Sequence, residues 1–254
     1  MIPRIIPCLL LSEGRLVKTT RFRDPRYVGD PINAVRIFNE KQVDELVVLD
    51  IGASVNGTRP DHAAIEEIVT EAFMPVAYGG GITSAEEANR IIQLGVEKVV
   101  VNSAAVDRPG LVSEIAERLG TSTLVVSIDA ARLNDRYEVM TYAGTRTTGR
   151  LAKDWAAEVA AAGAGEILLS SIDRDGTREG YDLELVSSVS NSVHIPVVAS
   201  GGAGSLEDLA GAIRQGGASA AAAGSLFVFH GPHRAVLITY PSYERRGQLF
   251  AIPT

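Results

Sequence analysis

The stretch PVVASGGAG at residues 196–204 passes from β-branched apolar residues into glycines, and SLED follows it at residues 205–208. This order predicts a buried parallel strand, a glycine turn and then a helix with Ser205 as its N-cap. Glycines let a backbone come close to a ligand, and the free N–H groups at a helix N-terminus favour an anion such as phosphate. Taken alone, the stretch is equally compatible with a tight turn that only joins a strand to a helix.

The same pattern occurs earlier in the chain, in PVAYGGGITS at residues 75–84. When Gly80 is aligned with Gly201, the same shift places residues 45–49 on residues 166–170. Matches at one constant shift indicate an internal repeat, and a repeat constrains the fold more strongly than any single predicted strand or helix. We therefore predict two copies of one half, each with its own candidate phosphate site.

The composition excludes several classes of protein. The chain has 254 residues, of which 46% are hydrophobic and 22% charged, and one α/β barrel commonly has this length. Its net charge of −7 argues against a surface for nucleic acid or anionic membranes. Cys8 is the one cysteine, so no internal disulfide is possible and a reducing cytoplasm is the expected setting. The apolar run at residues 5–11 is too short for a membrane span and is interpreted as a first strand rather than a signal peptide.

Predicted strands alternate with predicted helices along the whole chain. The strands are expected at residues 4–11, 45–50, 75–78, 98–101, 123–129, 166–170, 196–200 and 218–223. The helices are expected at residues 32–41, 61–72, 84–94, 109–119, 151–162, 183–189 and 205–215, with Asp61 and Ser84 as further N-caps. A long polar loop is expected at 12–31 and a small hairpin at 137–142. The β-branched segment 233–241, which ends in proline, argues against a long eighth helix.

Eight strand–helix units that close on themselves predict a single (β/α)8 TIM barrel over residues 1–254. Its two half-barrels are expected at about 1–120 and 121–240, with an irregular C-terminal tail at 241–254. Chemistry in such a barrel lies at the C-terminal ends of the strands. Two glycine-rich cradles on opposite sides of one mouth then suggest a ligand with a phosphate at each end.

Nine motifs together resemble one known family, the cyclase subunit of imidazole glycerol phosphate synthase from histidine biosynthesis. The motifs are IIPCL (5–9), GDP (29–31), DEL (44–46), GGGI (79–82), NSAA (102–105), SID (127–129), GAGEIL (163–168), SIDRDGT (171–177) and ASGGAG (199–204). They cover nearly the whole chain up to about residue 229. The resemblance implies a doubled barrel for a bisphosphate, nucleotide-like substrate. It also implies a glutaminase partner that docks at the N-terminal face and sends ammonia through the barrel to the top.

One catalytic residue of that family is missing. The family uses two aspartates as acid and base, one at the end of strand one and one at the end of strand five. The second is present as Asp129, but the position of the first is occupied by Leu10. Leucine cannot transfer a proton, and loss of a general acid or base typically lowers the rate by roughly 10²–10⁴-fold. The cyclase activity of this chain is therefore expected to be weak or absent, and the change argues equally against the sister isomerase reaction.

Strand ends and the resemblance together give the candidate ligands of phosphate and substrate. These are Lys18, Asp50, Gly80, Gly81, Asn102, Ser103, Ser170, Asp175, Gly176, Ser200, Gly201, Gly202, Gly224 and Ser225. Two alternatives remain open: Lys18 as a solvated loop lysine, and Asp50 and Asp175 as acceptors for backbone N–H groups of their own loops. His230 and His233 lack neighbouring cysteines or carboxylates that would complete a metal site, so neither a metal nor a cofactor is expected.

Four charged residues fall at the starts of strands, at the opposite end of the barrel: Arg4, Glu45, Lys98 and Glu166. Side chains pointing inward there would form a ring of alternating charge around the barrel axis. The resemblance assigns this ring to the gate through which ammonia enters. The alternative is a structural ion-pair plug, in which each buried charge needs the same partners.

The chain thus keeps the ammonia route and the phosphate cradles but lacks one of the two aspartates. Its segments PCLLL (7–11) and GSLFVFHGPHRAVLI (224–238) resemble a divergent branch of the family that occurs with surface-polysaccharide gene sets. That branch implies ammonia supply, with the glutaminase, to a separate sugar amidotransferase. The alternatives are an ordinary cyclase of histidine biosynthesis and, less well supported, a scaffold without ammonia passage.

Overall fold

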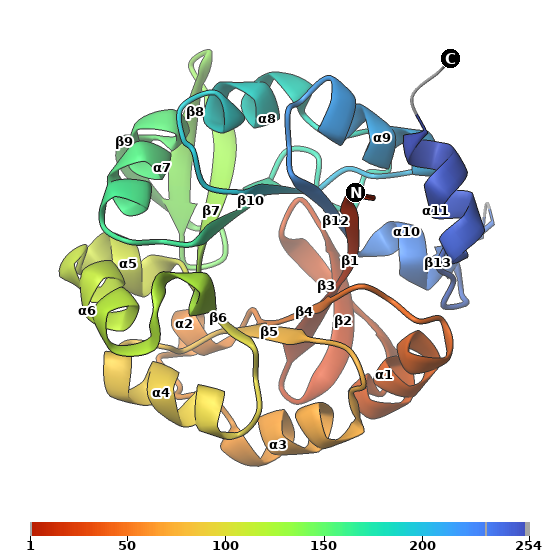
Figure 1. The fold of residues 1–254 in the computed structure, drawn as a ribbon, viewed down its shortest axis with the longest axis horizontal. Coiled ribbons are helices and arrows are strands. Elements are labelled where there is room, and N and C mark those ends of the chain that lie inside the picture. The colour runs from red at the N-terminus through yellow and green to blue at the C-terminus, as the bar shows by residue number, and fades with distance from the viewer. Residues whose placement is uncertain (1, 232, 252–254) are drawn as a thin grey trace.

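A ring of eight parallel strands forms the centre of the computed structural model, which describes residues 2–231 and 233–251 (Figure 1). The strands are β1 (Arg4–Ser12), β4 (Leu46–Asp50), β5 (Val76–Gly79), β6 (Lys98–Val101), β7 (Leu124–Leu133), β10 (Glu166–Ser171), β11 (Val197–Ser200) and β12 (Ala220–Ala223). They follow one another in this order around the ring, β7 pairs with β10, and β12 pairs with β1, so the ring is closed. The predicted (β/α)8 barrel is confirmed.

Helices cover the outside of the ring between successive strands (Figure 1). They are α1 (Pro31–Glu40), α3 (His62–Glu71), α4 (Ala85–Gln93), α6 (Gly110–Leu119), α7 (Ala152–Ala161), α8 (Leu183–Ser190) and α9 (Leu206–Arg214). The predicted N-caps Asp61, Ser84 and Ser205 all accept a backbone N–H of their helix. These caps satisfy donors that a helix start would otherwise leave unpaired. No helix among the described residues is long and apolar enough to cross a membrane.

The strands are apolar on both sides because both sides are buried. Their outward side chains pack under the helices, whereas the inward ones fill the barrel with mostly small groups. The inner set consists of Ile6, Cys8, Val47, Ala77, Val100, Val125, Leu168, Val198, Ala220 and Ala222. Each half of the chain contributes four strands, and the repeat itself remains a sequence prediction.

The prediction of a loop at 12–31 is wrong. This segment forms a hairpin of β2 (Arg15–Thr20) and β3 (Arg23–Gly29), and β2 pairs antiparallel with the end of β1. The apolar pair Leu16 and Val17 is buried against β1, while polar residues on the outer side gave the segment the composition of a loop. The hairpin at 137–142 is confirmed and is larger than expected, because β7 continues into β8 (Arg136–Thr141) and β9 (Arg146–Leu151).

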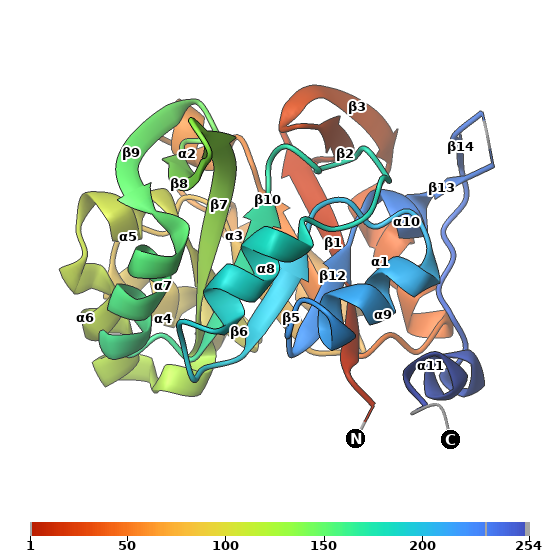
Figure 2. The same cartoon turned by 90° about the horizontal axis from the view of Figure 1, so that it is seen from above.

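The C-terminal part has no long eighth helix among its described residues, as predicted. After α10 (Ser225–Val228) comes a ribbon of β13 (Phe229–His230) and β14 (Ala235–Val236). The expectation of an irregular tail is wrong for α11 (Tyr243–Phe250), and residues 252–254 lie outside the described residues. Figure 2 places α11 at the end of the barrel where the strands begin. It is held there by Arg246, which pairs with Asp44. Four short helical segments were not predicted: α10, α2 (Ala53–Asn56), α5 (Ser103–Asp107) and a 3-10 turn at Thr121–Thr123.

Candidate functional site

A cavity of about 480 Å³ lies at the C-terminal ends of the barrel strands, where a (β/α)8 barrel places its chemistry. Most of the candidate residues from both halves of the chain line it together. These are Leu10, Asp50, Gly80, Gly81, Asn102, Ser103, Asp129, Ser170, Asp175 and Ser200. Lys18, Gly176, Gly201, Gly202, Gly224 and Ser225 are not among its lining residues.

The first predicted cradle opens into this cavity. Gly80 and Gly81 follow β5 with φ values of 125° and 72°, and a Cβ on Gly80 would lie 2.6 Å from the carbonyl oxygen of Asp50. A side chain is therefore excluded, and the backbone itself forms the wall. The hydroxyl of Ser103 accepts a hydrogen bond from the backbone N–H of Tyr142 at 2.9 Å. Because this bond uses a lone pair, the hydroxyl proton remains able to donate to an anion in the cavity.

The second predicted cradle is packed against neighbouring loops. A Cβ on Gly202 would collide with the carbonyl oxygen of Gly180, and the N–H of Gly180 donates to the carbonyl of Gly202 at 2.9 Å. The N–H groups of Gly204 and Ser205 both donate to Asp208 at 2.9 Å. The two cradles differ in that Gly80 and Gly81 line the cavity, whereas Gly201 and Gly202 do not.

Lys18 lies between Cys8 and Gly224. It is 4% exposed, its ammonium donates to the carbonyl of Cys8, and a Cβ on Gly224 would lie 2.5 Å from its Nζ. Burial lowers the pKa of Lys18. The alternative of a solvated loop lysine is wrong. The ammonium of Lys18 therefore lies directly beside the backbone of Gly224.

Two of the candidate carboxylates bind parts of the protein. Asp50 accepts the backbone N–H groups of Gly52 and Ala53 at 2.9 and 3.1 Å, which is the structural alternative that the sequence left open. Asp175 accepts the hydroxyl of Thr19 at 2.8 Å and a long bond from a backbone N–H at 3.5 Å. Burial raises the pKa of Asp175, and the Thr19 bond opposes the rise. Both carboxylates hold loops in place at the cavity wall.

Asp129, the candidate catalytic carboxylate, lines the cavity. It lies on β7 and accepts the side-chain amide of Asn102 at 2.7 Å and the hydroxyl of Ser127 at 3.3 Å. Burial raises the pKa of Asp129 to about 7, with repulsion from Asp175 adding to the rise and the hydrogen bonds opposing it. A carboxyl that titrates near neutral pH can both donate and accept a proton.

Leu10 replaces any second acid at the end of β1. It pairs with Val17 of β2 and with Leu49 of β4, and it lines the same cavity as Asp129. Leu49 and Val100 line the cavity with it, so this part of the wall is apolar. The position at which the resemblance implies a second carboxylate therefore presents a hydrocarbon surface to the cavity.

The predicted charged ring is present at the other end of the barrel. Arg4 bonds to both Glu45 and Glu166, and the Nζ of Lys98 lies 2.9 Å from Glu45 and 2.8 Å from Glu166. Arg4 and Glu45 lie on neighbouring strands, whereas the other three contacts join strands that are not neighbours in the sheet and so cross the barrel interior. Burial alone would raise the pKa of Glu166, but the two cations hold it below the usual value. Two cations and two anions thus close the inner apolar core at its N-terminal end.

Sequence reasoning missed the residues that the two hairpins bring to the mouth. Thr19 and Phe22 of the β2–β3 hairpin and Tyr142 of the β8–β9 turn all line the cavity. Only the predicted hairpin at 137–142 gave a signal for one of them. Within residues 2–231 and 233–251 no group of three or more His, Cys, Asp or Glu side chains is arranged to hold a metal ion.

Fold and site together define a (β/α)8-barrel protein with a titratable carboxyl at its mouth and an ion-pair ring at its base. The model of the family described as "Histidine biosynthesis protein" matches residues 4–233. The chain therefore belongs to this family, among the relatives of the HisF cyclase subunits.

Three relatives illustrate the likeness. "Putative imidazole glycerol phosphate synthase subunit HisF" of Leptospira borgpetersenii is 51% identical over 250 residues, which is 98% of both chains. "Putative imidazole glycerol phosphate synthase subunit hisF2" of Pseudomonas aeruginosa is 51% identical over 243 residues, 95% of this chain and 97% of its own. "Imidazole glycerol phosphate synthase subunit HisF" of Chlorobium phaeovibrioides is 47% identical over 226 residues, 89% of this chain and 90% of its own.

Proposed function

We propose that this protein is the cyclase-like subunit of a glutamine amidotransferase complex. It docks a glutaminase at the N-terminal face of the barrel and conducts ammonia through the interior. The acceptor is a separate sugar amidotransferase of surface-polysaccharide biosynthesis. The observation that carries the proposal is Leu10 at the cavity wall together with an intact ring of Arg4, Glu45, Lys98 and Glu166.

The interior of the barrel supports the ammonia route. Beyond the charged ring, the inner layer is apolar and includes the small side chains of Ala77, Ala220 and Ala222. An apolar interior favours neutral ammonia over ammonium, because burying an unpaired charge is costly. Leu10 and Leu49 pack against this layer and extend its apolar character to the cavity.

The mouth supports the loss of cyclase chemistry. Asp129 remains able to exchange a proton near neutral pH, but a ring closure that needs an acid and a base has only this one group of the family's pair. Asp50 and Asp175 are committed to holding loops and are not free to replace the missing group. We therefore expect a cyclase rate roughly 10²–10⁴-fold below that of an enzyme with a complete acid–base pair.

The alternative function is the cyclase of histidine biosynthesis itself. It is favoured by the open first cradle of Gly80, Gly81 and Ser103, by the elevated pKa of Asp129, and by the names of the relatives. In that case Asp129 would act alone as acid and base.

One assay separates the two functions. Cyclase turnover is measured with the bisphosphate substrate and a high concentration of ammonium salt, which removes the need for a glutaminase. Wild type is compared with Leu10→Asp, and Leu10→Asn serves as a control of the same size without a titratable group. We expect wild type and Leu10→Asn to be inert and Leu10→Asp to gain activity. Ready turnover by wild type, or robust growth of a cyclase-deficient histidine auxotroph carrying this gene, would refute the ammonia-delivery function.

A further inference from the structure

The outer surface of the β2–β3 hairpin is strongly basic. Residues 15–27 contain four exposed arginines, Arg15, Arg21, Arg23 and Arg26, but only one acidic residue, in a chain whose net charge is −7. In the described part of the chain none of the four belongs to an ion pair, whereas arginines such as Arg36 and Arg118 on the outer helices do. Arg21 is partly used, since its Nε donates to the carbonyl of Asp173 at 3.2 Å. The hairpin therefore presents positive charge that the molecule itself does not neutralise.

These arginines do not serve the cavity at the mouth. The hairpin contributes Thr19 and Phe22 to the lining of that cavity, but none of the four arginines. Positive charge at the mouth could instead steer a phosphorylated ligand into the cavity, but side chains that face the cavity would do this best. The arginines face outward instead, which indicates a binding partner outside the barrel.

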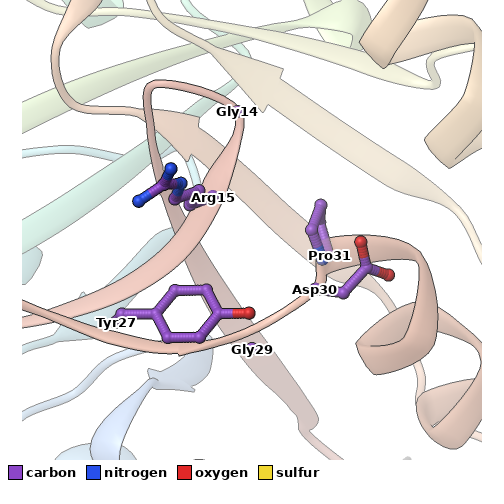
Figure 3. A pocket seen from close by; sticks show the side chains of 6 residues that line it. All are labelled: Gly14, Arg15, Tyr27, Gly29, Asp30 and Pro31. Atoms are coloured by element: carbon purple, nitrogen blue, oxygen red, sulfur yellow. The ribbon is translucent and has the colours of Figure 1, made fainter.

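A second hollow, of about 330 Å³, lies next to the hairpin. Figure 3 shows Arg15 and Tyr27 bordering it from the hairpin, with Asp30 and Pro31 of the α1 start on the other side. Tyr27 is 61% exposed, although tyrosine normally buries most of its ring in a monomer. Tyrosine and arginine are the residues that most often dominate binding energy in protein interfaces, typically where a side chain of the partner fills a pocket.

The hairpin is held firmly by the barrel beneath it. Its Lys18 donates to the carbonyl of Cys8, its Thr19 binds Asp175, and the backbone N–H of Arg21 donates to the carbonyl of Asp175 at 2.9 Å. A surface that is already ordered loses little conformational entropy when it binds.

The apolar side of this surface continues onto the C-terminal ribbon. The guanidinium of Arg26 stacks over the ring of Phe229 at 5.6 Å, and Phe229 pairs with Val236 in the ribbon. Val236 and Leu237 are both about half exposed. Positive charge, an exposed aromatic ring and neighbouring aliphatic groups are thus combined at the mouth end of the molecule (Figure 2).

We propose that the hairpin patch, defined as Arg15, Arg23, Arg26 and Tyr27, docks an acidic segment of the enzyme that accepts the ammonia, with an apolar side chain of that segment in the hollow beside Tyr27. The location places the acceptor over the mouth, where ammonia leaves the barrel. The identity of the partner as the acceptor rests on the proposed function, whereas the docking of an acidic protein segment does not.

Binding is tested on the full chain. The probe is a fluorescein-labelled peptide of glutamates with one central phenylalanine, followed by fluorescence anisotropy. Arg15→Glu/Arg23→Glu should weaken binding by about tenfold or more, since each reversal both removes an attraction and adds a repulsion. Arg90→Glu/Arg136→Glu is the matched control, because both arginines are exposed, lie outside the patch and have no ion pair in the described chain. We expect it to bind almost as wild type does.

Tyr27→Ala distinguishes a built site from general electrostatic attraction. It leaves the charge unchanged, so only occupation of the hollow predicts a loss, of about fivefold or more. Equal weakening by the patch and control reversals, unchanged binding in Tyr27→Ala, or tighter binding of an oligothymidine or of phosphatidylglycerol vesicles than of the peptide would each overturn the proposal.

A photocrosslinker at position 27 extends the test to the cell, with a crosslinker at the exposed Phe73 on the opposite end as control. The purified crosslinked protein should consume ammonia and bind Arg15→Glu/Arg23→Glu about tenfold more weakly than wild type. A crosslink to a second copy of this chain alone overturns the docking proposal. Stimulation of the glutaminase is measured on the same variants. If it stays intact while docking is absent, only the docking proposal fails, whereas ready cyclase turnover by wild type refutes the proposed function.

Discussion

Replacing Lys98 by methionine tests how the charged ring is balanced. In the wild type, two buried carboxylates share two cations, and the Nζ of Lys98 is within 2.9 Å of both Glu45 and Glu166. Methionine fills most of the volume of the lysine stem, so Lys98→Met removes the charge with little change in packing. The variant is left with Arg4 as the sole cation for two carboxylates.

The expected cost is about 3 kcal/mol of unfolding free energy at pH 7. Removing one partner of a buried ion pair costs about 3–5 kcal/mol, because an uncompensated charge stays behind. The lower end applies here because Arg4 still contacts both carboxylates and because the side chain of Lys98 keeps some contact with solvent.

The stability of wild type and of Lys98→Met should change with pH in opposite directions, which would identify Glu166 as the group responsible. In the wild type the pKa of Glu166 is lowered, so its contribution to stability is present above the unfolded pKa of about 4.3 and is lost as the pH falls through the folded pKa. In Lys98→Met burial prevails and raises the pKa of Glu166. The folded variant then binds a proton that the unfolded chain does not, and its stability increases as the pH falls toward 5.

Urea denaturation of both proteins at pH 7 and pH 5 measures the effect. The difference between wild type and variant should shrink from about 3 to about 1 kcal/mol over this range. Lys153→Met is the control, because Lys153 is exposed and belongs to no ion pair of the described residues, and we expect a change below about 0.5 kcal/mol. A loss under about 1 kcal/mol at pH 7, or a loss that grows on acidification, would refute this account of the ring.

Three further predictions concern the mouth and the tail. Gly80→Ala should lower the free energy of unfolding by about 2 kcal/mol or more in urea denaturation, because its Cβ would lie 2.6 Å from a backbone oxygen and its φ is positive. Gly211→Ala, in an open stretch of α9, should raise the free energy of unfolding by about 0.5–1 kcal/mol. Equal effects of the two substitutions would contradict the close approach at Gly80. Asp129→Asn should be more stable than wild type by about 2 kcal/mol at pH 8, and this difference should shrink toward pH 5. The reason is that the folded wild type loses stability as the pH rises from the unfolded pKa of Asp129 to its raised folded pKa. A difference that stays constant with pH would exclude Asp129 as the titrating group. Arg246→Met removes the buried cation that pairs with Asp44. Hydrogen exchange should therefore become faster at residues 243–251 and stay unchanged at the mouth of the barrel. Unchanged exchange in α11 would show that contacts other than this ion pair hold α11 in place.

The barrel could be predicted because its signals are local. Strands buried on both sides are continuously apolar, and polar N-caps such as Asp61, Ser84 and Ser205 mark helix starts within a few residues of the chain. The ring could be located for the same reason. Lys98 and Glu166 are charged residues at the start of otherwise apolar strands, which is an unusual choice unless they find partners inside the barrel.

The hairpin, α11 and the difference between the two cradles could not be predicted, because each depends on contacts between distant residues. The β2–β3 hairpin is fixed by Asp175, more than 150 positions away from Thr19, and α11 is fixed by the pairing of Arg246 with Asp44. Gly81 and Gly202 have equivalent positions in the repeated pattern, but only Gly81 lines the cavity, and Gly180 packs against Gly202.

The sequence by itself determined the barrel strands, the helices between them and the four charged residues at strand starts, because these depend on residue type and spacing along the chain. The family, and Leu10 at a position where an aspartate is expected, came from the resemblance of its motifs. The tertiary structure alone decided which cradle is open, which carboxylates hold loops, and that Asp129 titrates near pH 7. Those properties come from burial and from partners on other strands, and both exist only after the chain has closed into a barrel.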